Sequence, residues 1–270
     1  MYFGAQENRE MTSLVDEFNS QDNGITVNKQ SVPFEDFLNK LFTAAGSGNA
    51  PHVASYYGSY GRHLEPVCHP IDDYLSNGAK NKYFEAAWNN LQVDGRTYAL
   101  PLDIHGKGLY TNDAVMKEAG VDPDFTDWQS FSDACNTIVN ETDSMALSML
   151  NGRVGQSALR AYIIALTQAD GSILEGKPGN YEVTFDEGPG RKAAQLMADI
   201  TGDLGWDKQT FQSDFGRVND FINGDLGMLI EGTWGINNFE NENGKLPKDL
   251  SFKFHKPFMF PGNGQDVAWA

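Results

Sequence analysis

Aromatic side chains follow two of the segments that have the pattern of β-strands. Tyr56, Tyr57 and Tyr60 come after one such segment, in a loop rich in glycine, and Trp234 comes directly after another. Aromatic rings can stack on the C–H faces of a sugar, while planar polar side chains can hydrogen-bond its hydroxyl groups. A buried hydroxyl without a partner costs about 1–3 kcal/mol, so the polar groups would set specificity. Trp234 has a second interpretation, in which it begins a helix and packs on its own domain.

Polar candidates lie in comparable positions. Gln6 and Glu7 follow the first strand-like segment, although Glu7 is equally suited to cap the helix that comes next. Asp103 and His105 lie in a loop between two strand-like segments, where a structural role for the histidine has about the same weight as a binding role. Three weaker candidates complete the set: Arg153, Glu231 and Trp269.

The patterns of several enzyme classes are absent from the sequence. It contains no G-x-S-x-G, H-E-x-x-H or Walker sequence. Asp103 and Glu231 could be the carboxylate pair of a glycoside hydrolase, but nothing in the sequence supports the separation or the raised pKa that hydrolysis needs. Cys68 and Cys135 are too few for a disulfide framework or a cysteine-based metal cluster. We expect two unpaired structural thiols, since Cys68 and the adjacent His69 have no evident third partner for catalysis.

Composition restricts the partners of the chain. Its 270 residues include 37 acidic and 20 basic side chains, which gives a formal net charge of −17. Such a charge repels phosphate backbones and excludes sequence-independent nucleic-acid binding. No apolar run approaches the roughly 20 residues of a membrane span, and 40% apolar residues argue against intrinsic disorder.

Two series of α/β elements are predicted from hydrophobic periodicity. The first sixty residues have a βαβαβ pattern, with strands at 1–4, 25–27 and 52–56 and helices at 11–18 and 34–45. A helix at 83–91, a hairpin turning at Asp94-Gly95, a strand at 108–111 and a helix at 113–119 follow. The second series has helices at 128–140, 157–168, 189–201 and 214–223, strands at 146–149 and 226–230, a hairpin at 171–185 and an extended segment at 252–260. We therefore expect an N-terminal lobe at 1–111, a C-terminal lobe at 112–257, and a return crossing at 258–270.

Four stretches in order along the chain carry a family resemblance. The first is LVDEFN (14–19) with GITV (24–27), and the second is FLNKLFTAAGSGNAPHV (37–53), similar to a KL..A..SGNAPDV pattern in which His52 replaces the usual Asp. The third is YALPLDIH (98–105) with LYTN (109–112), KEAGVDP (117–123) and Trp128, and the fourth is FING (221–224) with GMLIEGTW (227–234). Together they resemble family 1 of the bacterial extracellular solute-binding proteins, the maltose-binding-protein-like proteins of ABC sugar importers.

The resemblance implies a type II periplasmic-binding-protein fold. Each of its two lobes would be a mixed, mostly parallel sheet flanked by helices, with a hinge between them and a mono- or oligosaccharide closed between the lobes. Permease subunits of an ABC importer would receive the sugar, and the protein would be a monomer without cofactor, metal or enzymatic activity. It would be extracellular, as a cell-surface lipoprotein or in the periplasm. The chain would then lack the export signal, part of the first strand and a large C-terminal portion.

The resemblance also bears on single residues. It places a stacking tryptophan at Trp234, a polar ligand contact at His105, and ligand contacts in the tyrosine loop. Other solutes remain open. Tyr56 and Tyr57 with a nearby histidine are similar to the phenolate sites of relatives that hold ferric ion, but those sites draw on the second lobe and this pair belongs to the first. Amino-acid binding usually needs an Arg–Asp pair, of which Arg153 alone is suitably placed, and a polyol phosphate is a further alternative. A carbohydrate-active enzyme is the least favoured interpretation.

Overall fold

A computed structural model describes residues 2–3, 9–149, 154–177, 179–186, 188–207, 216–240 and 244–255. The chain divides into two compact units, Met1–Ile104 and His105–Ala270. The lobe boundary predicted at residue 111 lies a few residues later, inside the first long strand of the second unit. The return crossing predicted at 258–270 lies outside the described residues.

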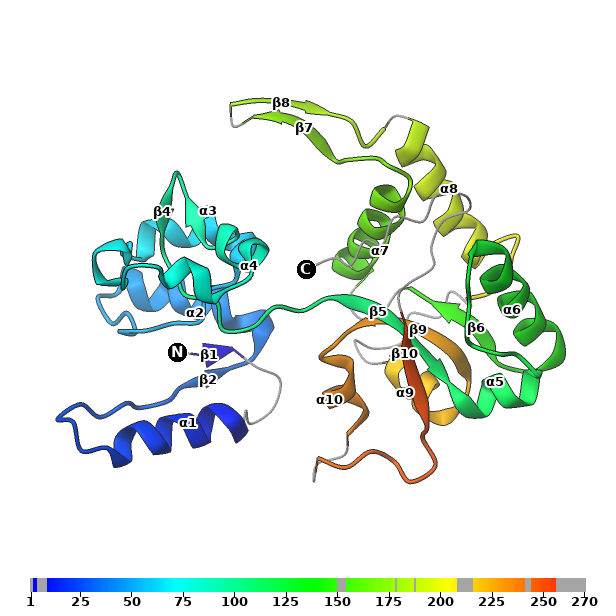
Figure 1. Ribbon diagram of the computed structural model, residues 1–270, viewed down its shortest axis with the longest axis horizontal. Coiled ribbons are helices and arrows are strands. Elements are labelled where there is room, and N and C mark those ends of the chain that lie inside the picture. The colour runs from blue at the N-terminus through cyan, green and yellow to red at the C-terminus, as the bar shows by residue number, and fades with distance from the viewer. Residues whose placement is uncertain are drawn as a thin grey trace. The chain divides into compact units, whose positions relative to one another are not determined.

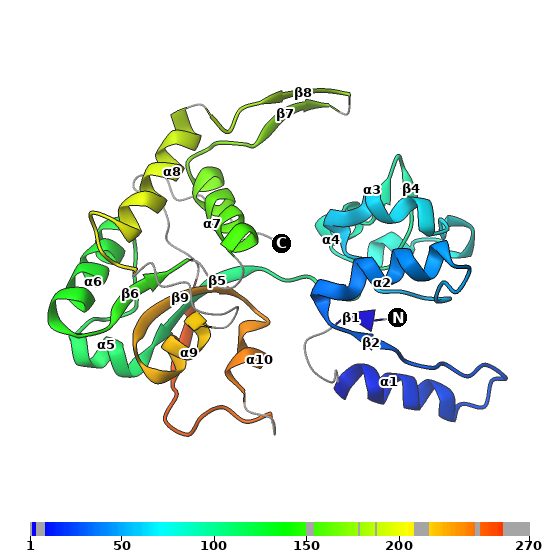
Figure 2. The same cartoon turned by 180° about the vertical axis from the view of Figure 1, so that it is seen from behind.

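The first unit is built from short elements. They are β1 (Tyr2–Phe3), α1 (Arg9–Ser20), β2 (Ser31–Val32), α2 (Phe34–Gly46), α3 (Gly61–Leu64), α4 (Glu85–Asn89), β3 (Gln92–Val93) and β4 (Arg96–Thr97), with 3-10 turns between α2 and α4. Strands β1 and β2 pair in parallel, and Figure 2 shows α1 and α2 beside this pair. A small buried cluster of Val32, Phe37, Leu41 and Leu64 forms the centre of the unit.

The predicted hairpin in the first unit is confirmed. Strands β3 and β4 pair antiparallel, with Val93 opposite Arg96. Both turn residues have positive φ angles, 49° at Asp94 and 81° at Gly95. A two-residue turn of this kind matches the twist of the flanking strands, and Asp-Gly is one of the few dipeptides that adopt it readily.

Two strands predicted in the first unit are wrong. Residues 25–27 belong to no ladder. The side-chain amide of Asn19 takes the place of a strand partner, because it donates to the carbonyl of Val27 at 3.0 Å and accepts from the Val27 N–H at 2.8 Å. Residues 52–56 also form no strand, and Ala54 and Tyr56 pack instead against the buried cluster.

The second unit contains a four-stranded sheet. Its strands are β5 (Lys107–Asn112), β6 (Met145–Ser148), β9 (Leu226–Gly232) and β10 (Phe252–His255), in the order β10-β5-β9-β6. The β6–β9 pair is parallel, whereas β5–β9 and β10–β5 are antiparallel. The sheet is mixed, as predicted, but antiparallel pairings outnumber parallel ones among its described strands. Figure 1 shows β10, β5 and β9 side by side.

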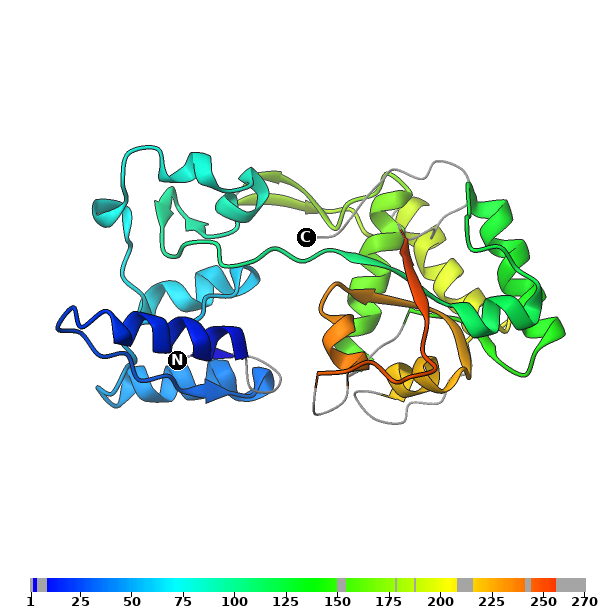
Figure 3. The same ribbon diagram turned by 60° about the horizontal axis from the view of Figure 1, so that its bottom comes forward.

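Helices cover both faces of this sheet. They are α5 (Asp113–Ala119), α6 (Trp128–Glu141), α7 (Val154–Gln168), α8 (Gly188–Thr201), α9 (Gly216–Asn223) and α10 (Gly235–Phe239), and a hairpin of β7 (Leu174–Lys177) and β8 (Asn180–Val183) connects α7 to α8. Side chains alternate between the faces of a strand. Leu109 and Ile230 therefore join the cluster formed with α5 to α8, whereas Tyr110 and Leu229 join the cluster formed with α9 and α10. The second unit thus has three layers (Figure 3).

Local signals fix the ends of two helices in the second unit. Asn112 caps α5 by accepting from the N–H groups of Ala114 and Val115. Its amide also donates to the Phe221 carbonyl at 2.7 Å, which ties the end of β5 to α9. Asp127 and Ser130 form a reciprocal capping box at the start of α6. These caps agree with the starts of the two helices that hydrophobic periodicity predicts at 113–119 and 128–140.

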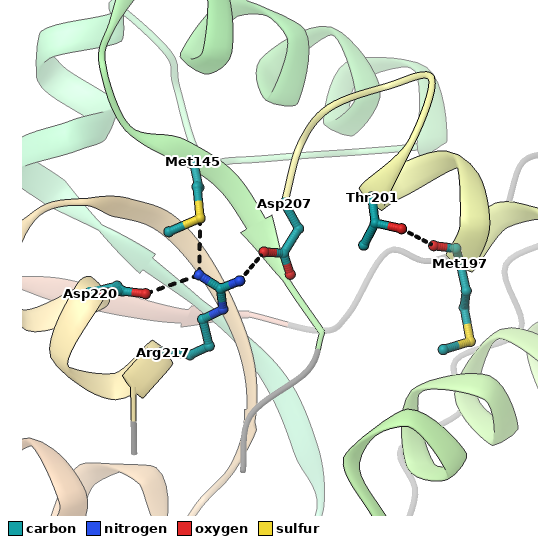
Figure 4. Close-up of polar contacts among 6 residues, drawn as sticks. All are labelled: Met145, Met197, Thr201, Asp207, Arg217 and Asp220. Atoms are coloured by element: carbon teal, nitrogen blue, oxygen red, sulfur yellow. Dashed lines mark hydrogen bonds and ion pairs between the residues drawn. The ribbon is translucent and has the colours of Figure 1, made fainter. Parts of the chain in front are cut away.

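A buried ion-pair network joins separate elements of the second unit (Figure 4). The Arg217 guanidinium of α9 lies 2.6 Å from Asp207 and 3.0 Å from Asp220, and it donates to the Met145 sulfur of β6 at 3.1 Å. The side chains of Arg217 and Asp207 are almost fully buried. Each buried charge here depends on its partner, because a buried ion left alone is very costly.

Both cysteines are free thiols, as predicted. Cys135 is buried on α6 and Cys68 is half-buried, and burial raises the pKa of each thiol. Among the described residues, no helix combines the length and the apolar character needed to cross a membrane.

Candidate functional site

The structure describes seven of the eleven predicted site residues. Three of the seven, His105, Glu231 and Trp234, belong to the second unit and lie together. The other four belong to the first unit: Tyr56, Tyr57, Tyr60 and Asp103. The remaining predictions fall outside the described residues: Gln6, Glu7, Arg153 and Trp269.

Antiparallel pairing brings the residues of the second unit together. Lys107 at the start of β5 is opposite Gly232 at the end of β9. His105, just before β5, is therefore beside Thr233 and Trp234, just after β9. We call His105, Lys107, Glu231, Thr233 and Trp234 the indole cluster.

The Trp234 side chain is half-buried and directly precedes α10. Its position before a helix agrees with the structural interpretation of this residue. The His105 ring meets the indole edge-on, with a centroid separation of 5.4 Å and an interplanar angle of 83°. The His105 Nδ1 lies 2.8 Å from the Thr233 hydroxyl, and the Thr233 N–H donates to the Gly106 carbonyl. The indole is thus bordered by two polar side chains with defined positions.

A buried ion pair lies next to the indole. The Lys107 Nζ is 3.5 Å from the Glu231 Oε1, and both side chains are only 6% exposed. The same Glu231 oxygen accepts from the Gly232 N–H at 2.7 Å. Burial lowers the pKa of Lys107; the Glu231 carboxylate opposes this effect and the positive charge of Arg160 adds to it.

Tyr110 supports the end of β9 from the neighbouring strand. Its hydroxyl donates to the Gly232 carbonyl at 3.0 Å. Burial raises the pKa of Tyr110 to about 12, and the Glu231 carboxylate contributes in the same direction. The hydroxyl therefore stays protonated at neutral pH and remains a hydrogen-bond donor to the backbone beside the indole cluster.

The three tyrosines of the first unit differ in their surroundings. Tyr57 and Tyr60 are partly exposed and contact each other, with ring centroids 5.2 Å apart. Tyr56 and Tyr60 also pack against the small core. The Tyr56 hydroxyl is buried and has no hydrogen-bond partner among the described residues. It lies close to Gly61, where a Cβ atom would be 3.0 Å from the hydroxyl oxygen. Tyr57 and Tyr60 therefore present part of their rings to solvent, whereas the Tyr56 hydroxyl is enclosed.

The first unit has two other surface features, Asp103 and a hollow beside α2. Asp103 is exposed, in the segment that ends this unit. A hollow of about 640 Å³ lies along α2, and none of the predicted site residues lines it. Its lining residues are Gln30, Asp36, Asn39, Lys40, Thr43, Ala44, Ser47, Asn49 and Pro51.

Three members of this arrangement were missed from the sequence: Lys107, Gly232 and Thr233. Lys107 carries the one charge in the strand sequence KGLYTN, and a charge in an otherwise uncharged strand was a usable signal. Gly232 and Thr233 gave none, since their importance depends on the register between β5 and β9.

The indole cluster offers an aromatic surface beside hydrogen-bonding groups. An indole with a neighbouring imidazole and hydroxyl can stack on a sugar ring and bind its hydroxyl groups. Glu231 already interacts with Lys107 and the Gly232 N–H. Among the described residues, no group of three or more histidine, cysteine or acidic side chains is arranged to hold a metal ion.

Comparison with known proteins defines the class of the fold. The cyclic alpha-maltosyl-1,6-maltose binding protein of Arthrobacter globiformis superposes with a TM-score of 0.77 at 20% identity, over 98% of this chain and 66% of that one. The maltotriose binding protein of Thermus thermophilus superposes with a TM-score of 0.73 at 17% identity, over 97% and 67%. The chain therefore has the two-lobed α/β fold of these binding proteins.

The family follows from the sequence profile. The profile of the bacterial extracellular solute-binding proteins matches residues 13–268. The chain belongs to this family.

Curated relatives match over shorter regions. The arabinooligosaccharide-binding protein of Halalkalibacterium halodurans is 29% identical over 126 residues, which is 45% of this chain and 28% of that protein. A putative binding protein of Brucella abortus is 28% identical over 116 residues, 41% of this chain and 28% of the relative. The matched regions thus span less than a third of these relatives.

Proposed function

We propose that the protein captures a mono- or oligosaccharide and delivers it to the permease subunits of an ABC importer. It acts outside the cytoplasmic membrane, in the periplasm or as a surface lipoprotein, as a monomer and without catalysing a reaction. The observation that carries the proposal is the half-buried Trp234 indole, held beside His105 and Thr233 where the paired strands β5 and β9 begin and end.

The physical basis is the match between this surface and a sugar ring. The C–H face of a pyranose is weakly apolar and suits an indole, while its hydroxyl edge needs donors and acceptors. The family membership and the oligosaccharide ligands named for its relatives support a carbohydrate. Tyr57 and Tyr60, whose rings contact each other, provide a separate aromatic surface in the first unit.

Isothermal titration calorimetry with a sugar panel tests the proposal on the protein as its gene encodes it. The panel contains maltose, maltotriose, cyclic maltooligosaccharides, arabinooligosaccharides, xylooligosaccharides and tagatose. We expect one group to bind, and Trp234→Ala to weaken its affinity roughly tenfold to a hundredfold by removing the stacking surface. Tyr74→Ala is the matched control, because Tyr74 is 86% exposed and lies outside the site; its affinity should equal that of the unaltered protein.

Other results would contradict the proposal in distinct ways. Binding of ferric citrate, an amino acid or a polyol phosphate, with no response to any sugar, would assign a different solute. Release of shortened oligosaccharides during incubation would show a carbohydrate-active enzyme. Equal sugar affinity in Trp234→Ala and Tyr74→Ala would move the site away from the indole cluster.

A further inference from the structure

The Trp234 indole packs closely against Gly232, which has no side chain. A Cβ atom at residue 232 would lie only 2.3 Å from the Cη2 and Cζ3 atoms of the indole. The six-membered ring therefore rests directly on the backbone at the end of β9. This contact supports the ring from one side, and the His105 ring meets its edge.

Lys107 restrains the ring from the opposite strand. Residues 107 and 232 are register partners, so their side-chain positions lie on the same face of the sheet. The Lys107 Nζ is 5.6 Å from the centroid of the indole ring, within the range of a cation–π interaction. The ammonium group is held in turn by the Glu231 carboxylate at 3.5 Å.

Stability alone does not explain a lysine at this position. The Lys107 and Glu231 side chains are nearly excluded from solvent, and removing two charges from water is costly. Replacing a buried ion pair by apolar residues of similar volume is often neutral or stabilising. The contact between the Lys107 ammonium and the Trp234 indole is an interaction that an apolar side chain at residue 107 could not make.

We propose that Lys107 is a positioning residue for ligand capture: held by Glu231, its ammonium fixes the Trp234 indole over Gly232 in the orientation that accepts a sugar. This inference rests on the proposed function, because it assigns Lys107 a role in the same site. Lys107 acts through the indole and does not itself contact the sugar.

The first experiment observes the indole without any ligand. The protein is labelled with 5-fluorotryptophan, and Trp234→Phe identifies the Trp234 resonance among the five tryptophans. Lys107→Met keeps an unbranched apolar side chain but removes the charge, and we expect the Trp234 fluorine resonance to shift and broaden. Lys107→Arg should retain the sharp resonance, because a guanidinium also stacks on an indole. Gly232→Ala provides the reference signal of a displaced ring.

The second experiment measures affinity for the sugar identified by calorimetry. Lys107→Met should bind it about tenfold more weakly, whereas Lys107→Arg should stay within about twofold of the unaltered protein. Arg217→Lys is the matched control, because it perturbs a different buried ion pair of the same unit; the Trp234 resonance and the affinity should not change. Lys107→Gln gives the same two measurements if the methionine variant does not fold.

The two experiments separate failure of this inference from failure of the proposed function. An unchanged Trp234 resonance in Lys107→Met would overturn the positioning role, whether or not a sugar binds. A shifted resonance with unchanged sugar affinity would also overturn it, because the fixed orientation would then not serve capture. If no sugar binds the unaltered protein, the proposed function and the inference that depends on it both fail, while the resonance still reports whether Lys107 orders the indole.

Discussion

The two units of the chain bury their apolar side chains to different extents. In the second unit, Phe131, Ile138 and Trp206 are completely buried between the sheet and the helices. In the first unit, Ile25, Val27 and Phe42 are exposed, and the described strands are two residues long. When helices cover both faces of a sheet, every side chain of a strand can be buried, whichever face it points to. A two-residue strand has only one side chain on each face, so little apolar surface can be buried against it.

The difference extends to charged groups. Arg217 pairs with Asp207 in the interior of the second unit, whereas Arg62 pairs with Asp94 on the surface of the first. The two Nη2–Oδ1 distances are similar, 2.6 Å and 2.8 Å, so the geometry of the pair does not distinguish them. What distinguishes them is the solvent around each pair, which determines the cost of breaking it.

Matched phenylalanine substitutions test the difference between the cores. Phe131 contacts the rings of Phe125, Trp128 and Trp206. We expect Phe131→Ala to destabilise the second unit by about 3–5 kcal/mol, because a rigid core cannot close the cavity. Phe37→Ala in the first unit should cost less, about 3 kcal/mol or below, because its buried cluster is small and lies among short elements that can collapse more readily.

Urea titration followed by hydrogen-exchange mass spectrometry reports each unit separately. Peptides from α6 and β9 follow the second unit, and peptides from α2 follow the first. Equal losses in the two variants would show that both cores are equally rigid. A larger loss for Phe37→Ala would reverse the comparison.

Matched arginine substitutions test the difference between the ion pairs. Arg217→Met leaves Asp207 buried without its main cation, and we expect a loss of about 3–5 kcal/mol in the second unit. Arg62→Met should change the first unit by at most about 1 kcal/mol, because both partners of that pair are largely exposed. The same exchange measurement follows both variants.

A double variant controls for the unpaired charge at the Arg217 site. Adding Asp207→Asn to Arg217→Met should recover part of the lost stability, since it removes the buried carboxylate that faced the guanidinium. If the double variant is no more stable than Arg217→Met, the loss comes from the packing of the guanidinium and its stem.

The same contrast explains how much of the fold could be predicted from the sequence. In the second unit, periodic helices such as α6 and strands such as β9 were located closely, because long periodic segments with caps are strong local signals. In the first unit, residues 25–27 and 52–56 were wrongly predicted as strands. Their apolar residues are typical of a strand, but a strand also needs a hydrogen-bonding partner. That partner comes from a distant part of the chain, so a local pattern does not reveal it.

The residues of the candidate site could also be predicted only in part. His105, Glu231 and Trp234 were selected from the sequence one by one, through their residue types and the family resemblance. Their proximity depends on the antiparallel register between β5 and β9, which no local pattern encodes. Gly232 was missed for this reason, since it gains its role only from the residue opposite, whereas Lys107 left a local signal in its charge within an otherwise uncharged strand.

The smallest expected effects on stability come from two exposed aspartates, one in each unit, whose contributions depend on pH. Asp127 accepts from the Ser130 N–H at 2.8 Å in the second unit, and Asp72 accepts from the Thr97 N–H at 3.1 and 3.2 Å in the first. These backbone hydrogen bonds lower the pKa of both carboxyl groups below the ordinary value of 3.8. A lowered folded-state pKa adds stability that is complete at neutral pH and disappears as the pH falls from the ordinary value to the folded-state value.

Substitution by asparagine removes the titration and keeps an oxygen that can accept the same hydrogen bond. Asp127→Asn should therefore flatten the loss of stability of the second unit between about pH 5 and pH 3, and Asp72→Asn should do so for the first unit. Hydrogen exchange at a series of pH values measures both. Because neither carboxylate is buried, the two effects should be of similar size, unlike those of the phenylalanine and arginine pairs. A much larger effect for Asp127 would mean that exposed hydrogen bonds also contribute more stability in the second unit than in the first. The two units would then differ at their surfaces as well as in their cores.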